Sequence, residues 1–118
     1  MSEGHRVKRV EKELRQIVGN FLIHGLKSPL PGVVSVAEIS VQPDLRSGKV
    51  FLSYIGPEQD KSETEEILKE EWPSLQRQIG KELKMKYVPK LKFFINQQQG
   101  GDENLEQMIA QMNAKRDA

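Results

Sequence analysis

Residues 37–54 read AEISVQPDLRSGKVFLSY, and this stretch decides the fold class. Apolar and polar residues alternate in its first part, which is typical of a half-buried β-strand. The segment 43–48, PDLRSG, is rich in turn-forming residues, and an alternating pattern resumes after it. We therefore predict two strands, at residues 33–42 and 49–55, that pair as an antiparallel hairpin.

Helical segments lie on both sides of the predicted hairpin. Residues 5–27 carry apolar residues at three- and four-residue spacing, which predicts a helix with one apolar stripe. The segment 62–65, SETE, matches a capping box in which Ser62 would begin the next helix. Because Pro73 interrupts the pattern, we expect either two helices, 62–71 and 73–86, or one sharply kinked helix.

The last third of the chain predicts a third strand and a further helix. Residues 90–95, KLKFFI, alternate with the period of a strand. The segment 97–101, QQQGG, is typical of a flexible connection, and Asp102 is a suitable residue to begin a helix. The apolar residues of that helix fall on one face: Leu105, Met108, Ile109 and Met112.

The length of 118 residues corresponds to one domain with a single core, and 6% aromatic residues predict that this core is mainly aliphatic. We expect an α+β domain over residues 5–97, in which helices pack on one face of a small sheet. A flexible linker and a helix are expected over residues 98–118. No stretch is apolar enough for a membrane span or a signal peptide, so we expect a soluble cytoplasmic protein without a membrane partner.

The residue types that most catalytic and metal sites require are scarce. The sequence has no cysteine and two histidines, which argues against disulfides, thiolate sites and a transition-metal site. We find no nucleophile–base set and no glycine-rich phosphate loop in the sequence. We therefore expect a protein that is not an enzyme and uses neither a cofactor nor a metal.

The net charge of +1 is the sum of strongly polarised segments. Residues 58–71 hold seven acids and two bases, and we interpret them as a solvated helix face. Residues 76–92 hold six bases and one acid, and residues 5–15 hold five bases and two acids. Such basic groups are either ordinary solvated surface or a patch that attracts polyanions. The candidate phosphate-binding residues are Arg77, Lys81, Lys84, Lys86, Lys90 and Lys92, with Arg6, Lys8, Arg9, Arg46 and Lys49 as secondary candidates.

Five motifs resemble one protein family in their order and spacing. They are RVKRV at 6–10, KSPLPGV at 27–33, ISVQPDLRSGKVF at 39–51, IGKEL at 79–83 and KYVPKLKFF at 86–94. Over roughly residues 6–96 the chain resembles the ribosome-binding factor A family of bacteria. The hairpin turn and the last of these motifs are the most specific parts of the resemblance.

The resemblance implies a KH-like fold of the second type, with the element order α-β-β-α-α-β. It implies a factor that acts late in small-subunit maturation, has a role in cold adaptation, and binds ribosomal RNA near the 5′ end of its precursor. The implied partners are the small ribosomal subunit and its RNA, bound without catalysis or a cofactor. We expect the protein to be a monomer.

The segment 71–73, Glu-Trp-Pro, departs from the family pattern. A typical KH domain clamps nucleotides with a Gly-x-x-Gly loop, and the family that this chain resembles has an Ala-x-Gly kink instead. Proline can supply the bend, but Glu71 would repel a phosphate, so we assign no RNA contact here. Trp72 is interpreted as a packed residue at the helix junction rather than a base-stacking platform.

Two questions stay open at this level. Phe94 shares the strand parity of Lys90 and Lys92, so either it stacks on a base or the helix that begins at Asp102 covers it. The alternative function is a non-catalytic adapter that binds another protein through the acidic helix or the C-terminal helix.

Overall fold

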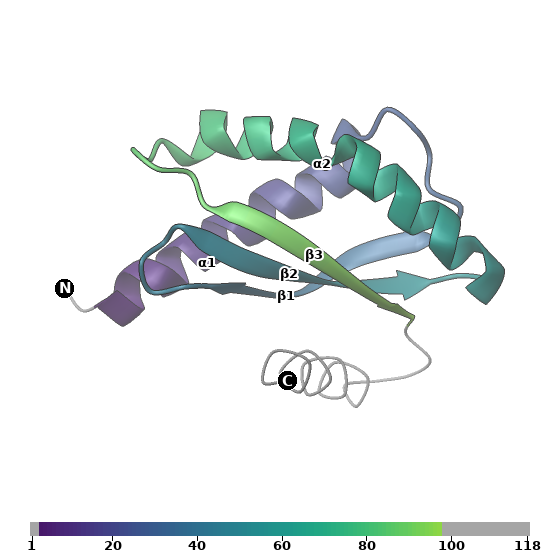
Figure 1. Cartoon of the computed structure of the whole chain (residues 1–118), viewed down its shortest axis with the longest axis horizontal. Coiled ribbons are helices and arrows are strands. Elements are labelled where there is room, and N and C mark those ends of the chain that lie inside the picture. Colours follow the sequence, from purple (N-terminus) through teal and green to yellow (C-terminus); the bar gives the residue numbers. More distant parts are fainter. Residues whose placement is uncertain (1–2, 98–118) are drawn as a thin grey trace.

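The computed structural model describes residues 3–97, and Figure 1 shows their arrangement. The expected linker and helix over residues 98–118 lie outside the described residues. The elements are α1 (Glu3–Asn20), the π-helical turn η1 (Phe21–Gly25), β1 (Val33–Val41), β2 (Ser47–Ile55), the 3₁₀ turn η2 (Glu58–Asp60), α2 (Lys61–Leu83) and β3 (Lys90–Gln97). This order confirms the predicted α+β class.

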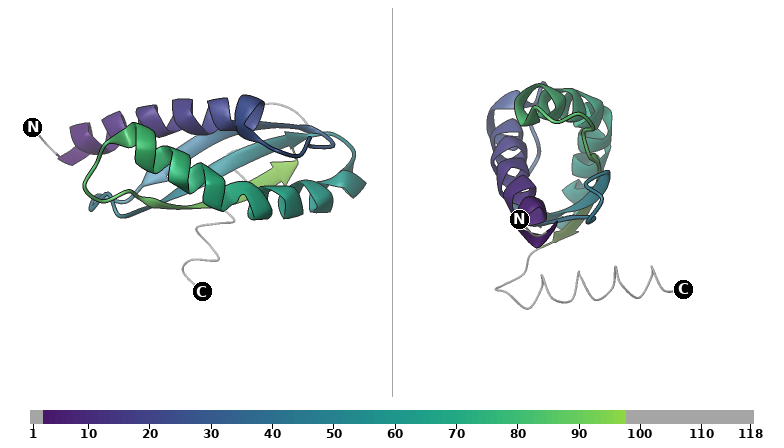
Figure 2. Two further views of the ribbon diagram at one scale, coloured as in Figure 1. Left: turned by 90° about the horizontal axis from the view of Figure 1, so that it is seen from above. Right: turned by 90° about the vertical axis from the view of Figure 1, so that its left-hand side faces the viewer.

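The three strands form one sheet in the order β1-β2-β3. β1 and β2 are antiparallel, as the hairpin pattern predicted, whereas β3 runs parallel to β2. A parallel neighbour needs a long crossover, which α2 supplies. Figures 1 and 2 show that α1 and α2 lie on the same face of the sheet, so no described helix covers the opposite face.

A bulge in β1 changes which residues face the core. The register shifts between Val36 and Glu38, which leaves Ala37 as the extra residue. Ile39 and Val41 are buried on the core side, as the alternation predicted. Ala37 was predicted to share their face, but it lies at the bulge and is only half-buried.

The core between the sheet and the two helices is mainly aliphatic, as the composition predicted. The apolar stripe of the first helical segment supplies Val10, Leu14, Ile17, Val18, Phe21 and Leu22. The sheet and the hairpin turn supply Ile39, Val41, Leu45, Val50, Leu52 and Leu91, and α2 supplies Leu68, Leu75, Ile79 and Leu83.

α2 is a single helix that contains Pro73, so the alternative of two separate helices is wrong. Figures 1 and 2 show that the helix bends along its length, which agrees with the kinked alternative. Proline causes such a bend because it has no N–H to donate and its ring displaces the preceding turn.

Both ends of α2 differ from the prediction. The helix begins at Lys61 after the cap residue Asp60, so Ser62 lies inside the helix and is not its cap. The hydroxyl of Thr64 donates to the Asp60 carbonyl over 2.9 Å, a contact to the preceding turn that the capping box does not include. At the other end the helix stops at Leu83, because Lys84 adopts a left-handed backbone conformation with φ 52°.

Candidate nucleic-acid interface

Three separate parts of the chain meet at one end of the molecule. Figures 1 and 2 place the start of α1, the β1–β2 turn and the α2–β3 connection together at that end. We call the exposed cations of these segments the basic end. Its members are Arg6, Lys8 and Arg9 from α1, Arg46 from the turn, Lys84 and Lys86 from the connection, and Lys90 from the first position of β3.

The β1–β2 turn has a defined geometry that positions Arg46. Leu45 is buried, has φ 60° and donates its N–H to the Gln42 carbonyl over 2.8 Å. The Arg46 N–H donates to the Asp44 carboxylate over 3.0 Å, and the Arg46 carbonyl accepts from the Lys90 N–H over 3.0 Å. These bonds hold the β1–β2 turn against the beginning of β3. The Arg46 guanidinium therefore lies beside the cations of the α2–β3 connection.

Tyr87 is an exposed aromatic residue beside two cations of the basic end. Its exposed fraction is 57%, although most large apolar side chains of the domain are buried. The Arg46 guanidinium carbon lies 5.1 Å from the centre of the Tyr87 ring, and the Lys86 ammonium lies 5.6 Å from it. An accessible ring between cations offers a nucleic acid both a stacking surface and phosphate contacts.

The sequence reasoning missed Tyr87, because it considered only Trp72 and Phe94 as stacking residues. The available signal was the position of Tyr87 next to Lys86 and before Pro89, in a connection too short to form an element of its own. The meeting with Arg46 could not be read from the sequence, because the two residues lie 41 positions apart.

Arg77 and Lys81 belong to a second basic group rather than to the basic end. They lie one helical turn apart on α2 and line a groove of about 520 Å³ between α2 and the end of the first helical segment. Lys27 and His24 line the same groove, and neither was a candidate. Glu82 lies there as well, so the charge of this groove is mixed.

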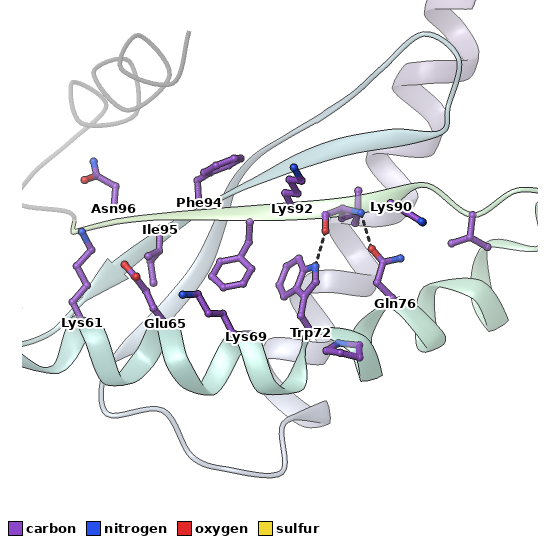
Figure 3. Close-up of a pocket in the computed structure, with 14 residues that line it drawn as sticks. Lys61, Glu65, Lys69, Trp72, Gln76, Lys90, Lys92, Phe94, Ile95 and Asn96 are labelled. Carbon is purple, nitrogen blue, oxygen red and sulfur yellow. Dashed lines mark hydrogen bonds between the residues drawn. The ribbon is translucent and has the colours of Figure 1, made fainter. Parts of the chain in front are cut away.

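Lys49 and Lys92 occupy a third position, on the sheet. Figure 3 shows Lys92 on the side of β3 that points away from α2, and Lys49 stands opposite it in the β2–β3 register, so both lie on the face that the described helices leave uncovered. Lys92 is exposed, whereas Lys49 is half-buried. The eleven candidate phosphate-binding residues therefore lie in three places: the basic end, the groove lined by Arg77 and Lys81, and this face of the sheet.

The junction at residues 71–73 is a packed structure. Glu71 is 8% exposed, and its carboxylate accepts hydrogen bonds from the backbone N–H groups of Lys27 and Ser28. Glu71 therefore does not belong to the solvated helix face predicted for residues 58–71, because its carboxylate is buried and bonded to the backbone. Trp72 is half-buried and donates its indole N–H to the Leu91 carbonyl, which confirms the interpretation of this residue as packed.

The acidic segment lies away from the basic end. η2 and the first half of α2 lie at the opposite end of the molecule in Figures 1 and 2. Glu58, Glu63, Glu66 and Glu70 are exposed there, as expected of a solvated face, whereas Glu71 is the buried exception. The net charge of only +1 is thus the sum of two oppositely charged ends of the molecule.

Within residues 3–97 we find no group of acidic, histidine or cysteine side chains able to hold a metal ion. Among the helices of the same range, none has the length and apolar character needed to cross a membrane. A groove of about 1200 Å³ lies between α2 and the edge of β3 (Figure 3). Trp72, Phe93 and Ile95 line it together with lysine side chains.

The sequence model of the family described as ribosome-binding factor A matches residues 6–109 of this chain. A ribosome-binding factor A from Bdellovibrio bacteriovorus is 39% identical over 118 residues, which cover 100% of this chain and 88% of that protein. Another from Clostridioides difficile is 29% identical over 98% of this chain and 90% of that protein.

The fold also agrees with a solved structure of the same name. The crystal structure of ribosome-binding factor A from Thermus thermophilus superposes with a TM-score of 0.64 at 15% identity, over 75% of this chain and 93% of that chain. The match of the family model over most of the chain and the 39% identical relative lead to one conclusion. The chain belongs to the ribosome-binding factor A family.

Proposed function

We propose that this protein binds the small ribosomal subunit through its ribosomal RNA, late in maturation and near the 5′ end of the precursor RNA. The observation that carries the proposal is the basic end, where three parts of the chain bring their cations to one end of the molecule and two of these cations, Arg46 and Lys86, lie beside the exposed ring of Tyr87. The proposed action needs neither catalysis nor a cofactor. A monomer in the cytoplasm, folded over residues 5–97, would suffice for it.

A structural comparison supports this choice of partner. A homology model of the Thermus thermophilus ribosome-binding factor A was fitted into the electron cryo-microscopy map of its complex with the 30S subunit. Our chain superposes on that model with a TM-score of 0.60 at 16% identity, over 73% of this chain and 90% of that chain. We extend the 30S partner to this chain as part of the proposal.

The charge distribution suggests how the protein would approach RNA. Phosphate contacts supply affinity and fix orientation but do not select a sequence. The basic end would make such contacts, while the acidic half of α2 would be repelled by the same polyanion. Tyr87 would then stack on an unpaired base, because unstacked bases in single-stranded RNA are the usual targets of aromatic side chains.

Charge reversal at matched positions tests the proposal. The basic-end variant is Lys84→Glu/Lys86→Glu, and the control is Lys61→Glu/Lys69→Glu on the acidic half of α2, with the same change in net charge. Binding to precursor and mature small subunits is measured by co-sedimentation, and binding to ribosomal RNA fragments by fluorescence anisotropy at several salt concentrations. We expect a slope of log affinity against log salt of about −0.7 to −0.9 for each neutralised phosphate.

The basic-end variant should bind at least about tenfold more weakly with a shallower salt slope, and the control should change little. Equal losses for both variants would contradict the location of the interface. If the unmodified protein binds neither RNA nor subunits at low salt, the adapter function becomes the better explanation. Tyr87→Ala should cost about 1–3 kcal/mol without a change of slope, and Tyr87→Phe should retain binding.

A further inference from the structure

The outer edge of β3 is bonded to α2 at Leu91, whose backbone N–H and carbonyl pair with the side chains of Gln76 and Trp72. The backbone groups of successive residues in a strand point to opposite edges, so those of Phe93 and Ile95 point the same way as those of Leu91. Within residues 3–97 these outward groups of Phe93 and Ile95 meet neither a strand nor a side-chain partner. Beyond Leu91 the edge of β3 is therefore open.

The other edge of the sheet, β1, is bonded to α1 in its central and last parts. Arg15 donates to the carbonyls of Val36 and Ala37. Glu11 accepts a hydrogen bond from the Val41 N–H over 2.8 Å. Because unpaired backbone groups at a sheet edge are a template for a further strand, such side-chain bonds close the edge of β1. The second half of β3 lacks this closure.

The groove between α2 and β3 runs along this open part of the edge (Figure 3). Its wall on β3 extends from Lys90 to Asn96, which is about 20 Å of extended chain. Trp72, Phe93 and Ile95 line it, and all three are half-buried apolar side chains. Small-molecule sites usually measure about 300–1000 Å³, and this groove of about 1200 Å³ is larger. Its length and volume suit a stretch of polypeptide.

The charged side chains that line this groove are mostly basic. They are Lys61, Glu65 and Lys69 from α2, and Lys90 and Lys92 from β3. The Lys69 ammonium lies 4.0 Å from the Glu66 carboxylate, but both side chains are exposed and such a pair contributes little. An acidic ligand can therefore replace this contact. The excess of lysine selects an occupant with carboxylates.

We propose that this groove binds an extended acidic segment of another protein, which adds as a strand to the outer edge of β3. The backbone of the segment bonds to the outward groups of Phe93 and Ile95. Its apolar side chains pack on the surface around Trp72, and its carboxylates pair with the surrounding lysines. Strand addition takes its affinity from main-chain hydrogen bonds and its specificity from the alternating side chains. This binding does not depend on the proposed RNA contact at the basic end.

RNA is the weaker candidate for this groove. The groove borders the acidic half of α2, whose exposed carboxylates repel a polyanion. Stacking on a base requires an accessible ring, but Trp72 is half-buried and its ring centre lies 4.6 Å from that of Phe93. Phe94 stacks on Phe51 and lies on the side of β3 that points away from α2 (Figure 3). The open backbone groups and the apolar lining therefore favour a peptide.

Short synthetic peptides test the proposal on the full-length chain. Acetylated peptides are compared in which valine alternates with glutamate, with serine or with lysine. Affinity is measured by the fluorescence of Trp72, the only tryptophan of the chain, and should fall in that order. Hydrogen exchange locates the bound peptide. The glutamate peptide should slow exchange of the Phe93 and Ile95 amides, whereas the Phe94 amide, which points toward β2, should change little.

Methylation of the peptide backbone separates strand addition from simple charge attraction. In the glutamate peptide, N-methyl groups are placed either on all valines or on all glutamates. Because successive N–H groups of a strand point to opposite edges, one pattern removes the donors that face β3 and the other removes those that face away. The first should weaken binding at least about tenfold, and the second should change it little. Equal affinities of the two methylated peptides would overturn strand addition.

Two variants with the same change in net charge distinguish this site from the basic end. Lys61→Glu/Lys69→Glu should bind the glutamate peptide at least about tenfold more weakly, whereas Lys84→Glu/Lys86→Glu should bind it as the unmodified protein does. Binding of ribosomal RNA should show the reverse pattern, so each proposal can fail without the other. Thermal unfolding checks that both variants are folded.

The amides of Phe93 and Ile95 also decide between the possible occupants. The proposal is overturned if none of the peptides slows their exchange, or if Lys61→Glu/Lys69→Glu binds the glutamate peptide unchanged. A single-stranded RNA oligonucleotide that slows exchange at both amides, where the peptides do not, would assign the groove to RNA instead.

Discussion

The indole nitrogen of Trp72 donates a hydrogen bond to the backbone carbonyl of Leu91, with 2.8 Å between the two atoms. Gln76, one turn later, accepts from the Leu91 N–H over 2.6 Å (Figure 3). It also donates to the Pro89 carbonyl over 3.1 Å. β3 is an edge strand, so these backbone groups have no neighbouring strand to pair with. Instead, the side chains of Trp72 and Gln76 form these hydrogen bonds and hold the bent helix α2 against the sheet.

Trp72→Phe tests this link. The variant keeps an aromatic ring against Phe93, whose ring centre lies 4.6 Å from that of Trp72, but it removes the donor for the Leu91 carbonyl. We expect the free energy of unfolding to fall by about 1–2 kcal/mol, since a part-buried acceptor loses its partner. Urea unfolding followed by circular dichroism measures the change. Tyr87→Phe, which alters an exposed ring, is the control, and equal stability of both variants would contradict the role of the bond.

Glu71 makes a second link, between α2 and the segment that leads into β1. Its buried carboxylate accepts from the N–H groups of Lys27 and Ser28, so Glu71→Ala leaves two donors without their partner. We expect a loss of about 3 kcal/mol in the free energy of unfolding. The exposed neighbour Glu70→Ala should stay within about 0.5 kcal/mol of the unmodified protein.

Hydrogen exchange gives an independent check of Glu71. The amide protons of Lys27 and Ser28 should exchange faster in Glu71→Ala, while those in the middle of β2 should change only in proportion to the global loss of stability. Unchanged exchange at both amides would mean that the carboxylate does not hold this segment.

The periodic patterns of the sequence predicted the strands and helices because each pattern reflects a single buried face. The alternation around residues 37–54 located the hairpin, and the stripe in residues 5–27 located the first helical segment. The bulge at Ala37 was missed because it depends on how two strands pair. Ser62 was misread as a cap because the helix already begins at Lys61, after the cap residue Asp60, and the local motif does not contain that information.

For the candidate site, too, the features that depend on neighbouring residues could be predicted from the sequence, and the contacts between distant residues could not. The sequence revealed that acids and bases are segregated, but not which basic segments meet. Arg46 reaches Tyr87 only because the hairpin turn and the end of α2 lie at the same end of the sheet. Glu71 was expected to be a repulsive surface charge, since its partners are two backbone groups more than 40 residues away.

Two glycine substitutions should change stability in opposite directions. Gly19 lies inside α1, and a Cβ placed there meets nothing within 4 Å, so Gly19→Ala should stabilise the protein by about 0.5–1 kcal/mol. A Cβ at Gly32 would lie 2.5 Å from the Tyr54 ring and 2.8 Å from the Ile55 carbonyl oxygen. Gly32→Ala should therefore destabilise by at least about 1–3 kcal/mol. Thermal unfolding of both variants measures the effect, and shifts of the same sign would contradict the packing around Tyr54.

Lys84 combines a structural cost with a proposed function, and the two should separate on mutation. Its φ of 52° is a left-handed conformation that costs a lysine about 1 kcal/mol and glycine almost nothing. Lys84→Gly should therefore raise the free energy of unfolding by about 1 kcal/mol, because the exposed side chain contributes little to the core.

The same variant should bind ribosomal RNA more weakly, with a salt slope reduced by the equivalent of about one phosphate. Lys84→Asn is the matched control, since asparagine tolerates the left-handed conformation and also lacks the charge. It should lose as much RNA affinity as Lys84→Gly while keeping a stability close to that of the unmodified protein or slightly above it. A gain in stability without a loss of affinity would remove Lys84 from the proposed interface, because the folded domain would then bind equally well without this cation.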